Sequence, residues 1–203
     1  MGEKYIGTKF ETIFQGKFIS NKTEARKIKQ LIELGKYLGQ MGFEDNNGGN
    51  FSFKSSRGVV IKTTGSFPHK LKEDNFVLLN GFKKNKVFVF GDKEPSSEAR
   101  LHWSAYEARP DINYVIHTHD FTAVNCPAEL DEVVYIKEYP YGTIESARAV
   151  KKASKKGNYL MMENHGIIVL GKTIPSILKL IKKYHEKFKA ITANPTVNCR
   201  IKK

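Results

Sequence analysis

Two pairs of short segments in this chain have the pattern of β-hairpins, and this pattern restricts the possible folds most. Residues 51–55 and 59–63 alternate apolar and polar side chains on either side of a three-residue turn. Alternation with period two indicates strands with one buried face. Residues 76–79 and 87–90 form a second pair, joined by Asn80-Gly81 and a basic loop. Because a hairpin joins strands that run in opposite directions, we predict a largely antiparallel sheet.

The rest of the chain mixes helical and strand patterns, which predicts an α/β fold. Helical periodicity of the apolar residues predicts four helices, over residues 23–41, 97–109, 144–156 and 173–191. We expect Thr23 to cap the first of them. Shorter apolar runs predict strands over residues 113–119, 133–136, 159–162 and 167–170. Residues 1–20 are expected to form an extension with room for one short strand, and residues 21–203 a single domain.

Composition narrows the class of protein further. The chain of 203 residues is 40% hydrophobic and 27% charged, as in ordinary soluble globular proteins. It has no run of about 18 apolar residues and no apolar signal segment at its start, so we expect no membrane span and no membrane partner. The two cysteines, Cys126 and Cys199, do not form a CxxC pair, which favours a reducing, cytoplasmic location.

The net charge of +13 raises the question of nucleic-acid binding. The lysines, however, are scattered along the chain, and those in predicted helices fall mostly on faces expected to be solvated. We therefore expect no nucleic acid as a partner. A general attraction for anionic substrates that carry phosphate is the milder consequence of the same charge.

Three histidines have the pattern of a metal site. His117 and His119 are two residues apart in a predicted strand, so their side chains should point to the same face of it. Two buried imidazoles on one face need polar partners, and a metal ion serves both at once. His165 precedes Gly166 and is either a hydrogen-bonded turn residue or a third ligand. Three histidines with one open position are typical of a catalytic zinc site.

Glu98 places a carboxylate at the start of the predicted helix 97–109. Negative charge is favourable at a helix N-terminus, so this residue is either a capping carboxylate or a base beside the metal. Such a base would remove a carbon-bound proton next to a carbonyl group. His102 lies four residues later, on the same helix face, and is either a partner of the site or a packing residue.

Several small polar residues are suited to binding an anion. Ser96 and Ser97 stand at the same helix start, where free backbone N–H groups and two hydroxyls suit a phosphate. Gly49-Asn50 and Thr64-Gly65 are glycine-containing loop segments of similar character. Each segment alone is also a common turn.

These residues form part of an ordered series of motifs that resembles the class II aldolase/adducin family. The resemblance covers about residues 22–190 and implies a three-layer α/β/α fold with a central, mainly antiparallel sheet. It also implies a homotetramer with active sites at the subunit interfaces. The motifs are, in order, Gly49-Asn50-Phe51-Ser52, Thr63-Thr64-Gly65, Pro95-Ser96-Ser97-Glu98-Ala99-Arg100-Leu101-His102, Arg109-Pro110-Asp111, His117-Thr118-His119, Tyr141-Gly142-Thr143 and Asn164-His165-Gly166.

The resemblance also implies roles for individual residues. His117, His119 and His165 would hold one Zn²⁺ per subunit, although imidazole ligands suit other divalent metals as well. Glu98 would bind the resting metal and then be displaced to act as the base. The residues implied to hold the substrate phosphate are Gly49, Asn50, Thr64, Gly65, Ser96 and Ser97.

The activity that the resemblance implies belongs to carbohydrate metabolism. A metal-dependent aldolase would reversibly cleave a ketose 1-phosphate, similar to L-fuculose 1-phosphate, into dihydroxyacetone phosphate and an aldehyde. The alternatives are a dehydratase of the methylthioribulose-1-phosphate type and a non-catalytic adducin-like interaction protein. The filled ligand positions disfavour the interaction protein. Related epimerases carry aspartate in place of Glu98, which disfavours that activity.

The segment between His119 and Tyr141 is shorter than in the aldolases that the chain resembles. In those enzymes this segment helps shape the aldehyde side, and a neighbouring subunit supplies a tyrosine as the proton donor. Tyr135, Tyr139 and Tyr141 are the candidates for that role here. Asp120 directly follows His119 and is either an orienting partner of a histidine or a capping residue.

Overall fold

A mixed β-sheet runs through the middle of the computed structural model, which describes residues 7–43, 46–126 and 128–193. The strands lie in the order β1-β5-β4-β3-β2-β6-β9-β8-β7. Neighbours are antiparallel except at the two edges, where β1 pairs with β5 and β7 with β8 in parallel. The prediction of a largely antiparallel sheet is confirmed. The strands are β1 (Glu11–Phe14), β2 (Asn50–Ser55), β3 (Gly58–Lys62), β4 (Phe76–Lys83), β5 (Lys86–Phe90), β6 (Tyr114–Thr118), β7 (Val134–Ile136), β8 (Tyr159–Met162) and β9 (Gly166–Gly171).

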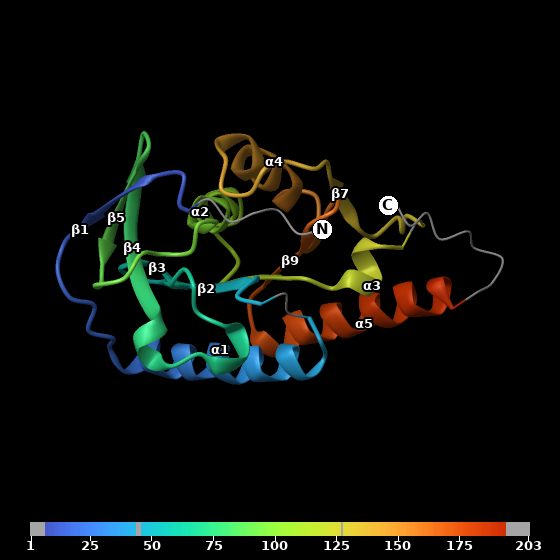
Figure 1. Ribbon diagram of the computed structural model, residues 1–203, viewed down its shortest axis with the longest axis horizontal. Coiled ribbons are helices and arrows are strands. Elements are labelled where there is room, and N and C mark those ends of the chain that lie inside the picture. Colours follow the sequence, from blue (N-terminus) through green and yellow to red (C-terminus); the bar gives the residue numbers. More distant parts are fainter. Residues whose placement is uncertain (1–6, 44–45, 127, 194–203) are drawn as a thin grey trace.

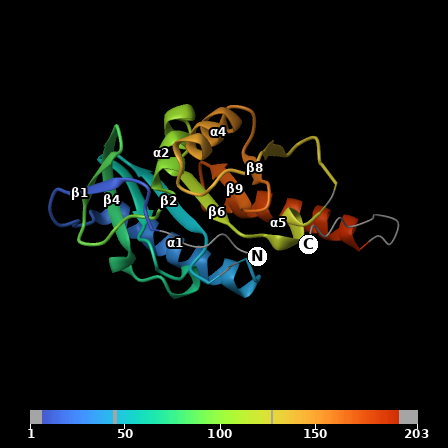
Figure 2. The same cartoon turned by 45° about the horizontal axis from the view of Figure 1, so that its top comes forward.

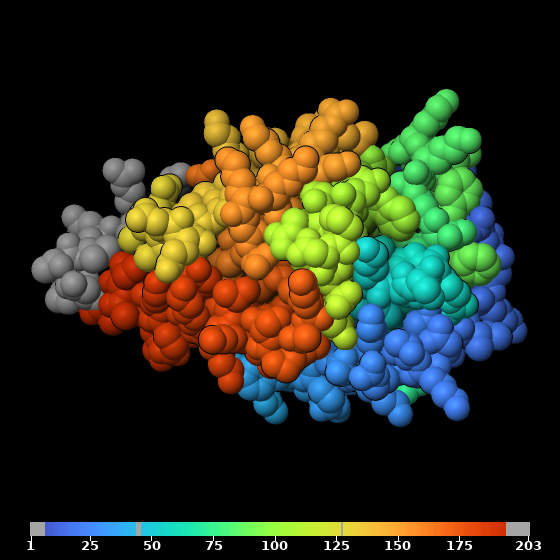
Figure 3. Space-filling view, turned by 180° about the vertical axis from the view of Figure 1, so that it is seen from behind, coloured from blue at the N-terminus to red at the C-terminus, as the bar shows by residue number. Residues whose placement is uncertain are grey.

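Helices cover both faces of this sheet (Figures 1 and 2). Helices α1 (Lys22–Gln40) and α5 (Ile174–Thr192) pack on one face, and α2 (Ala99–Ala108) and α4 (Ile144–Ser154) pack on the other. The three-layer α/β/α fold expected from the sequence is therefore confirmed. Figure 3 shows α2 at the surface between α4 and the β2–β3 hairpin. A short helix, α3 (Phe121–Val124), lies against α5, and two 3-10 turns cover Pro68–Lys70 and Glu73–Asn75.

The alternation of side chains along the strands divides the buried residues into two cores. Phe51 and Ile116 belong to the core beneath α1 and α5, whereas Val115 belongs to the core beneath α2 and α4. The polar residues that alternate with Phe51 and Ile116 therefore lie on the α2 face. They are Asn50, Ser52 and His117, and all three are buried.

The first helix begins earlier than the sequence suggested. Its N-cap is Asn21, and Thr23 lies inside the first turn. The Asn21 side chain accepts the N–H of Glu24 at 3.0 Å, and the Glu24 carboxylate accepts the N–H of Asn21 at 2.9 Å. This reciprocal pair satisfies two free N–H groups at once, which a threonine cap at position 23 would not do. The prediction that Thr23 caps the helix was wrong.

The second hairpin is tighter than expected. Asn80 and Gly81 do not form its turn, because β4 continues through them to Lys83. The pairing register with β5 shifts between Leu79 and Gly81, which indicates that Asn80 is the extra residue of a bulge. The chain instead reverses at Lys84, whose φ of 55° lies in the left-handed region.

The segment before α1 contributes one strand to the sheet. Strand β1 pairs with β5, and Phe10 is buried in the core beneath α2. No helix in the described part of the chain combines the length and apolar character required to cross a membrane. Cys126 is half-buried and is not in a disulfide, and Cys199 lies outside the described residues.

Candidate metal centre and active site

The three histidines predicted as ligands lie together in the structure. His117 is in β6, His119 directly follows that strand, and His165 is in the turn between β8 and β9. One ring nitrogen from each lies within 4.8 Å of the others. The Nε2 atoms of His117 and His119 are 3.3 Å apart. Two nitrogen ligands at about 2.0–2.1 Å from one tetrahedral zinc ion are about 3.3–3.4 Å apart, so this spacing fits a metal ion.

The adjoining strand holds the histidine rings in this arrangement. Nδ1 of His117 donates to the carbonyl oxygen of Ile167 at 2.9 Å, which leaves Nε2 with a lone pair for the cluster. Gly166 provides the necessary space. A Cβ at this position would lie 2.7 Å from the carbonyl oxygen of Thr118 and 2.8 Å from the ring of His119. Any side chain at position 166 would therefore push the histidines out of place.

Glu98 holds a buried carboxylate against these histidines. Its Oε2 lies 3.3 Å from Nε2 of His117, and its Oε1 lies 3.6 Å from Nε2 of His165. Asn50 donates an amide hydrogen to Oε2 at 2.7 Å, whereas Oε1 is buried without a hydrogen-bond donor among the described residues. The side chain does not cap α2. A buried anionic oxygen without a donor is costly, and a metal cation would compensate it.

Burial and neighbouring charges set the protonation states of the cluster. Burial lowers the pKa of His117 to about 3 and the pKa of His119 to about 4. Burial raises the pKa of Glu98, but His117, His165 and the Asn50 hydrogen bond outweigh it and bring the pKa to about 2. At neutral pH both of these imidazoles are neutral and the carboxylate is ionised. These are the forms that bind a divalent metal.

Asp120 supports the segment that follows His119. The aspartate is fully buried and accepts the N–H of Ala123, which caps α3. It also lies 3.0 Å from Nδ1 of His185 on α5. The ring of His185 packs against Phe43, and the carbonyl oxygen of Phe43 accepts the N–H of His119 at 3.1 Å. Asp120 is thus the capping residue considered from the sequence, and the histidine that it contacts is not one of the three predicted ligands.

The three segments predicted to bind phosphate are joined to one another. The N–H of Ser96 donates to the carbonyl of Lys62, and the N–H of Thr64 donates to the carbonyl of Glu94, each at 3.0 Å. The Lys62 ammonium is buried and donates to the carbonyl of Asn47 at 3.0 Å and to that of Ser66. These contacts bring residues 46–50, 62–66 and 94–98 together beside Glu98, and they place a fixed positive charge below the loops.

Within these segments the predicted phosphate-binding residues are not equivalent. Thr64 and Ser97 are half-buried and Gly65 is exposed, whereas Ser96 is buried and accepts the N–H of Glu98 at 3.3 Å. Gly49 has a φ of 79°, and a Cβ there would lie 3.0 Å from the carbonyl oxygen of His117. The side-chain amide of Asn50 faces inward, between Glu98 and His102.

Two further residues of the site were missed by the sequence analysis. The hydroxyls of Ser52 and Tyr106 lie behind His102 and continue the hydrogen bonds that begin at Glu98. A signal was present in the sequence, because Asn50 and Ser52 are two apart in a strand and Tyr106 follows His102 by four in a helix. Such spacings place side chains on one face, but they do not show that the two faces meet.

The three candidate tyrosines lie in and after β7. Tyr135 is partly exposed, and its hydroxyl accepts the N–H of Leu130 at 2.8 Å. Tyr139 is half-buried, and Tyr141 is buried with the Lys9 ammonium 4.4 Å from its ring centroid.

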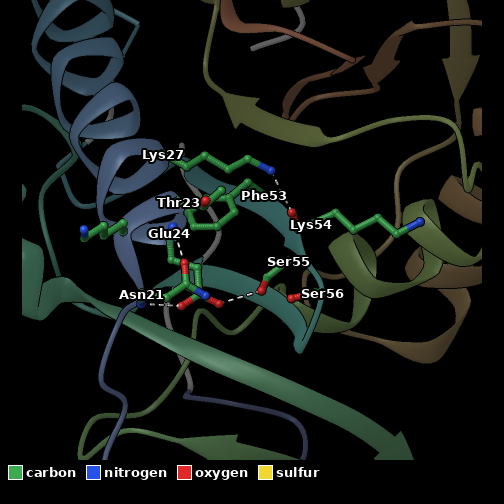
Figure 4. A pocket seen from close by; sticks show the side chains of 9 residues that line it. Asn21, Thr23, Glu24, Lys27, Phe53, Lys54, Ser55 and Ser56 are labelled. Atoms are coloured by element: carbon green, nitrogen blue, oxygen red, sulfur yellow. Dashed lines mark hydrogen bonds between the residues drawn. The ribbon is translucent and has the colours of Figure 1, made fainter.

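A separate hollow of about 460 Å³ lies at the N-terminus of α1 (Figure 4). Its lining includes Glu24, whose carboxylate is engaged by Arg57, Ser55 and Asn21. The ammonium of Lys27 donates to the carbonyl of Lys54 at 3.0 Å. The only carboxylate in this lining is therefore already engaged, and none of the three clustered histidines lines the hollow.

A three-layer fold that presents three histidines and a buried carboxylate beside glycine- and serine-containing loops is suited to a metal-dependent enzyme acting on phosphorylated substrates. Residues 29–191 match the model of the Class II Aldolase and Adducin N-terminal domain. The chain belongs to the class II aldolase and adducin family, as its resemblance had indicated. Members of this class of aldolase depend on a metal, and the histidine cluster could hold one.

Individual relatives are aldolases of sugar phosphates. The L-fuculose phosphate aldolase of Escherichia coli (strain K12) is 31% identical over 158 residues, which cover 69% of this chain and 70% of that protein. The 5-methylthioribulose-1-phosphate/5-deoxyribulose-1-phosphate aldolase of Escherichia coli O45:K1 is 29% identical over 167 residues, covering 75% and 76% of the two chains. A solved structure of L-fuculose 1-phosphate aldolase has a TM-score of 0.69 and 25% identity, covering 84% of this chain and 89% of the other. Within the family the chain is therefore most like the fuculose-phosphate aldolases.

Proposed function

We propose that this protein is a zinc-dependent class II aldolase that reversibly cleaves a ketose 1-phosphate to dihydroxyacetone phosphate and an aldehyde. The observation that carries the proposal is the position of Glu98, an ionised and buried carboxylate 3.3 Å and 3.6 Å from two of the three clustered histidines. A base at this point can reach a carbon whose carbonyl group is polarised at the histidine cluster. The names of the relatives support a sugar phosphate as the substrate.

The roles of the residues follow from their chemistry. His117, His119 and His165 would hold the metal, which supplies the positive charge that polarises the substrate carbonyl. Glu98 would accept the proton from the hydroxyl-bearing carbon next to that carbonyl. The hydroxyls of Ser96, Ser97 and Thr64, with the backbone of Gly49, Asn50 and Gly65, would bind the phosphate, assisted by the charge of Lys62 below them.

The proton donor on the aldehyde side of the reaction would come from a neighbouring subunit. We place residues 21–203 in one catalytic domain of a cytoplasmic homotetramer, with strand β1 completing the sheet of each subunit. Tyr135 is the most exposed of the three tyrosine candidates, so it is the one best placed to reach a second copy of the chain.

Product analysis tests the aldolase proposal directly. L-Fuculose 1-phosphate, 5-deoxyribulose 1-phosphate and 5-methylthioribulose 1-phosphate would each be incubated with the metal-loaded protein, and release of dihydroxyacetone phosphate would be measured with and without chelator. We expect release that chelator abolishes and added zinc restores. Consumption of a ketose without release of dihydroxyacetone phosphate would instead identify a dehydratase, and no consumption of any substrate would contradict the proposal.

Glu98→Gln tests the role of the base. The variant keeps the size of the side chain but removes its ability to accept a proton, so we expect cleavage to fall by about 10²–10⁴-fold. Phosphate binding should be retained, because the three loops do not change. Glu107→Gln is the matched control, since Glu107 is an exposed glutamate on the same helix. Wild-type rates in metal-loaded Glu98→Gln would exclude Glu98 as the base.

A further inference from the structure

Five buried polar side chains form a continuous chain of hydrogen bonds that ends on Glu98. From the carboxylate outward, the contacts are Glu98 to Asn50, Asn50 to His102, His102 to Ser52, and Ser52 to Tyr106. The contact between His102 and Ser52 is 2.7 Å, and that between Ser52 and Tyr106 is 2.9 Å. None of these residues is more than 7% exposed. Hydrogen bonds so well shielded from water are strong and hold their members in place.

Strand β2 and helix α2 present these polar side chains at nearly the same spacing. Asn50 and Ser52 are two residues apart on β2, a distance of about 6.6 Å along a strand. Glu98, His102 and Tyr106 recur every four residues along α2, a distance of about 6 Å along a helix. Residues from the strand therefore fit between residues from the helix, in the order helix, strand, helix, strand, helix. The chain of hydrogen bonds is a consequence of packing α2 along β2.

The donor and acceptor properties of these groups allow only one direction of donation along the series of hydrogen bonds. The ionised Glu98 carboxylate can only accept, so Asn50 must turn its NH₂ group towards Glu98 and its carbonyl oxygen towards His102. That oxygen also only accepts, so His102 must carry its hydrogen on Nε2. Burial lowers the pKa of His102 to about 3, and the neutral ring therefore has no hydrogen left for Nδ1. Ser52 must then donate to Nδ1, so its oxygen accepts the hydrogen of Tyr106 at 2.9 Å, a shorter contact than the 3.5 Å between that hydroxyl and the carbonyl oxygen of Asn113.

The orientation of the Asn50 amide is linked to the direction in which these hydrogen bonds are donated. The two ends of an amide have nearly the same shape, so packing alone does not distinguish them. If the amide turned over, its oxygen would face the Glu98 carboxylate and repel it. The Glu98 carboxylate and the N–H of His102 together oppose this reversal, and the hydroxyl of Ser52 supplies the donor that Nδ1 of His102 then needs.

We propose that His102, Ser52 and Tyr106 are positioning residues, which act through Asn50 to hold the carboxylate of Glu98 in place for proton transfer. The inference rests on the proposed function, because Glu98 is taken as the base of an aldolase. It assigns a role in that reaction to residues that lie behind the carboxylate and do not touch the substrate. It also gives the Asn50 side chain a role separate from phosphate binding.

The direction of the hydrogen bonds can be measured without any substrate. Nitrogen-15 NMR of the metal-loaded protein labelled at histidine distinguishes a ring protonated at Nε2 from one protonated at Nδ1. The His102 signals are identified by their loss in His102→Gln. We expect His102 to carry its hydrogen on Nε2 in the wild type, and its Nδ1 signal to shift in Ser52→Ala, which removes the donor to that nitrogen. A wild-type ring protonated at Nδ1 would overturn the proposal, whether or not the protein is an aldolase.

Proton exchange then tests the effect on Glu98. The rate at which dihydroxyacetone phosphate exchanges its carbon-bound hydrogen with solvent isolates the proton-transfer step. In Ser52→Ala and His102→Leu we expect this rate to fall by about 10–100-fold at saturating substrate, as for other outer partners of metal-site residues, with KM and metal content little changed. His102→Gln should recover most of the rate, because a glutamine can donate from nearly the same point as Nε2.

Controls separate this role from a general structural one. Ser154→Ala removes another fully buried serine hydroxyl, which donates to a carbonyl of its own helix, and should leave exchange unchanged. If His102→Gln is no better than a folded, metal-loaded His102→Leu, the N–H group is not the important feature and the proposal fails. If His102→Leu does not fold, Ser52→Ala decides, and a wild-type exchange rate in that variant overturns the proposal. If the wild type exchanges no hydrogen, the aldolase proposal fails, and the NMR result still decides the direction of the hydrogen bonds.

Discussion

The two faces of strands β2 and β6 differ in chemistry although they belong to the same strands. Towards α1 and α5, Phe51 and Ile116 are fully buried among apolar side chains. Towards α2, the alternating positions carry Asn50, Ser52 and His117, and these are joined to Glu98 and His102 by polar contacts. We infer that the apolar face supplies stability and the polar face supplies the chemistry. Single substitutions on opposite faces should therefore separate the two properties.

The largest effect is expected from His117→Ala on the polar face. The variant loses a ligand at the centre of the cluster, so we expect stoichiometric metal binding to be lost. Activity should fall by about 10³-fold or more, because the charge stabilisation that a metal supplies is worth several kcal/mol. Metal content after dialysis and release of dihydroxyacetone phosphate measure these losses. Circular dichroism should still show a folded protein, because the apolar face is unchanged.

Phe51→Ala is the corresponding substitution on the apolar face, and we expect it to lower stability without affecting metal binding. Removing a fully buried phenyl ring should lower the free energy of unfolding by about 3–5 kcal/mol. The fraction that remains folded should bind metal at the normal stoichiometry and turn over substrate at the normal rate. Phe67→Ala is the control for this arm, since Phe67 is 42% exposed. Loss of metal from folded Phe51→Ala, or full retention of metal by His117→Ala, would contradict the separation of the two faces.

The polar face should also make the metal-free protein sensitive to acid. The folded pKa values of His102 and His117 are about 3 and that of His119 is about 4, all below the ordinary value of 6.5. As the pH falls below 6.5, the unfolded chain takes up protons at these groups before the folded protein does, so stability is lost. We expect about 1 kcal/mol for each histidine at pH 5.5. Glu98, with a folded pKa of about 2 against 4.5, adds a further loss below pH 4.5.

Urea unfolding of the chelator-treated protein between pH 7 and pH 5 measures the slope of the free energy of unfolding against pH. His117→Ala should reduce the slope, because it removes one of the groups that bind protons on unfolding. His69→Ala should not, since His69 lies on the surface in a 3-10 turn. A slope that His117→Ala leaves unchanged would mean that the histidine cluster is not the source of the acid sensitivity.

The sequence predicted the apolar face better than the details of the polar one. Alternation along residues 51–55 and helical periodicity along residues 173–191 depend on burial of one face. Such burial produces a regular pattern of apolar residues that can be recognised within a single segment. Thr23 and Asn80-Gly81 were misjudged because caps and turns depend on single hydrogen bonds. At Asn21 a reciprocal pair with Glu24 was available, and at Asn80 pairing with β5 favoured a bulge over a turn.

The candidate site could be predicted as far as its residues lie in compact motifs. His117 and His119 share one predicted strand, and the resemblance to a family placed His165 and Glu98 beside them. The contact between Ser52 and His102 spans 50 residues and depends on how α2 is set against β2. A local pattern contains no information about that placement. His185 was likewise not expected to meet Asp120, because the pairing depends on the packing of α5 against α3.

The smallest effect on stability and metal affinity is expected from a substitution at Asp120, which connects the two faces. Asp120 follows the polar face in the chain but lies against His185 of α5, the helix of the apolar face. Asp120→Asn keeps the side-chain oxygen that accepts the N–H of Ala123 and removes the charge beside His185. We expect the free energy of unfolding to fall by about 1 kcal/mol. Metal affinity should fall by less than about 10-fold, because the carbonyl of Phe43 also holds the backbone of His119.

A double-mutant cycle with His185→Gln shows whether the contact itself is responsible. If the charge of Asp120 acts through His185, the effects of Asp120→Asn and His185→Gln on unfolding and on metal affinity should be less than additive. Additive effects would mean that Asp120 acts only as the cap of α3. The apolar helix layer would then contribute stability alone, and the separation between the two faces would be complete. Coupling would instead show that α5 helps to hold His119, so that the layer opposite the site also shapes it.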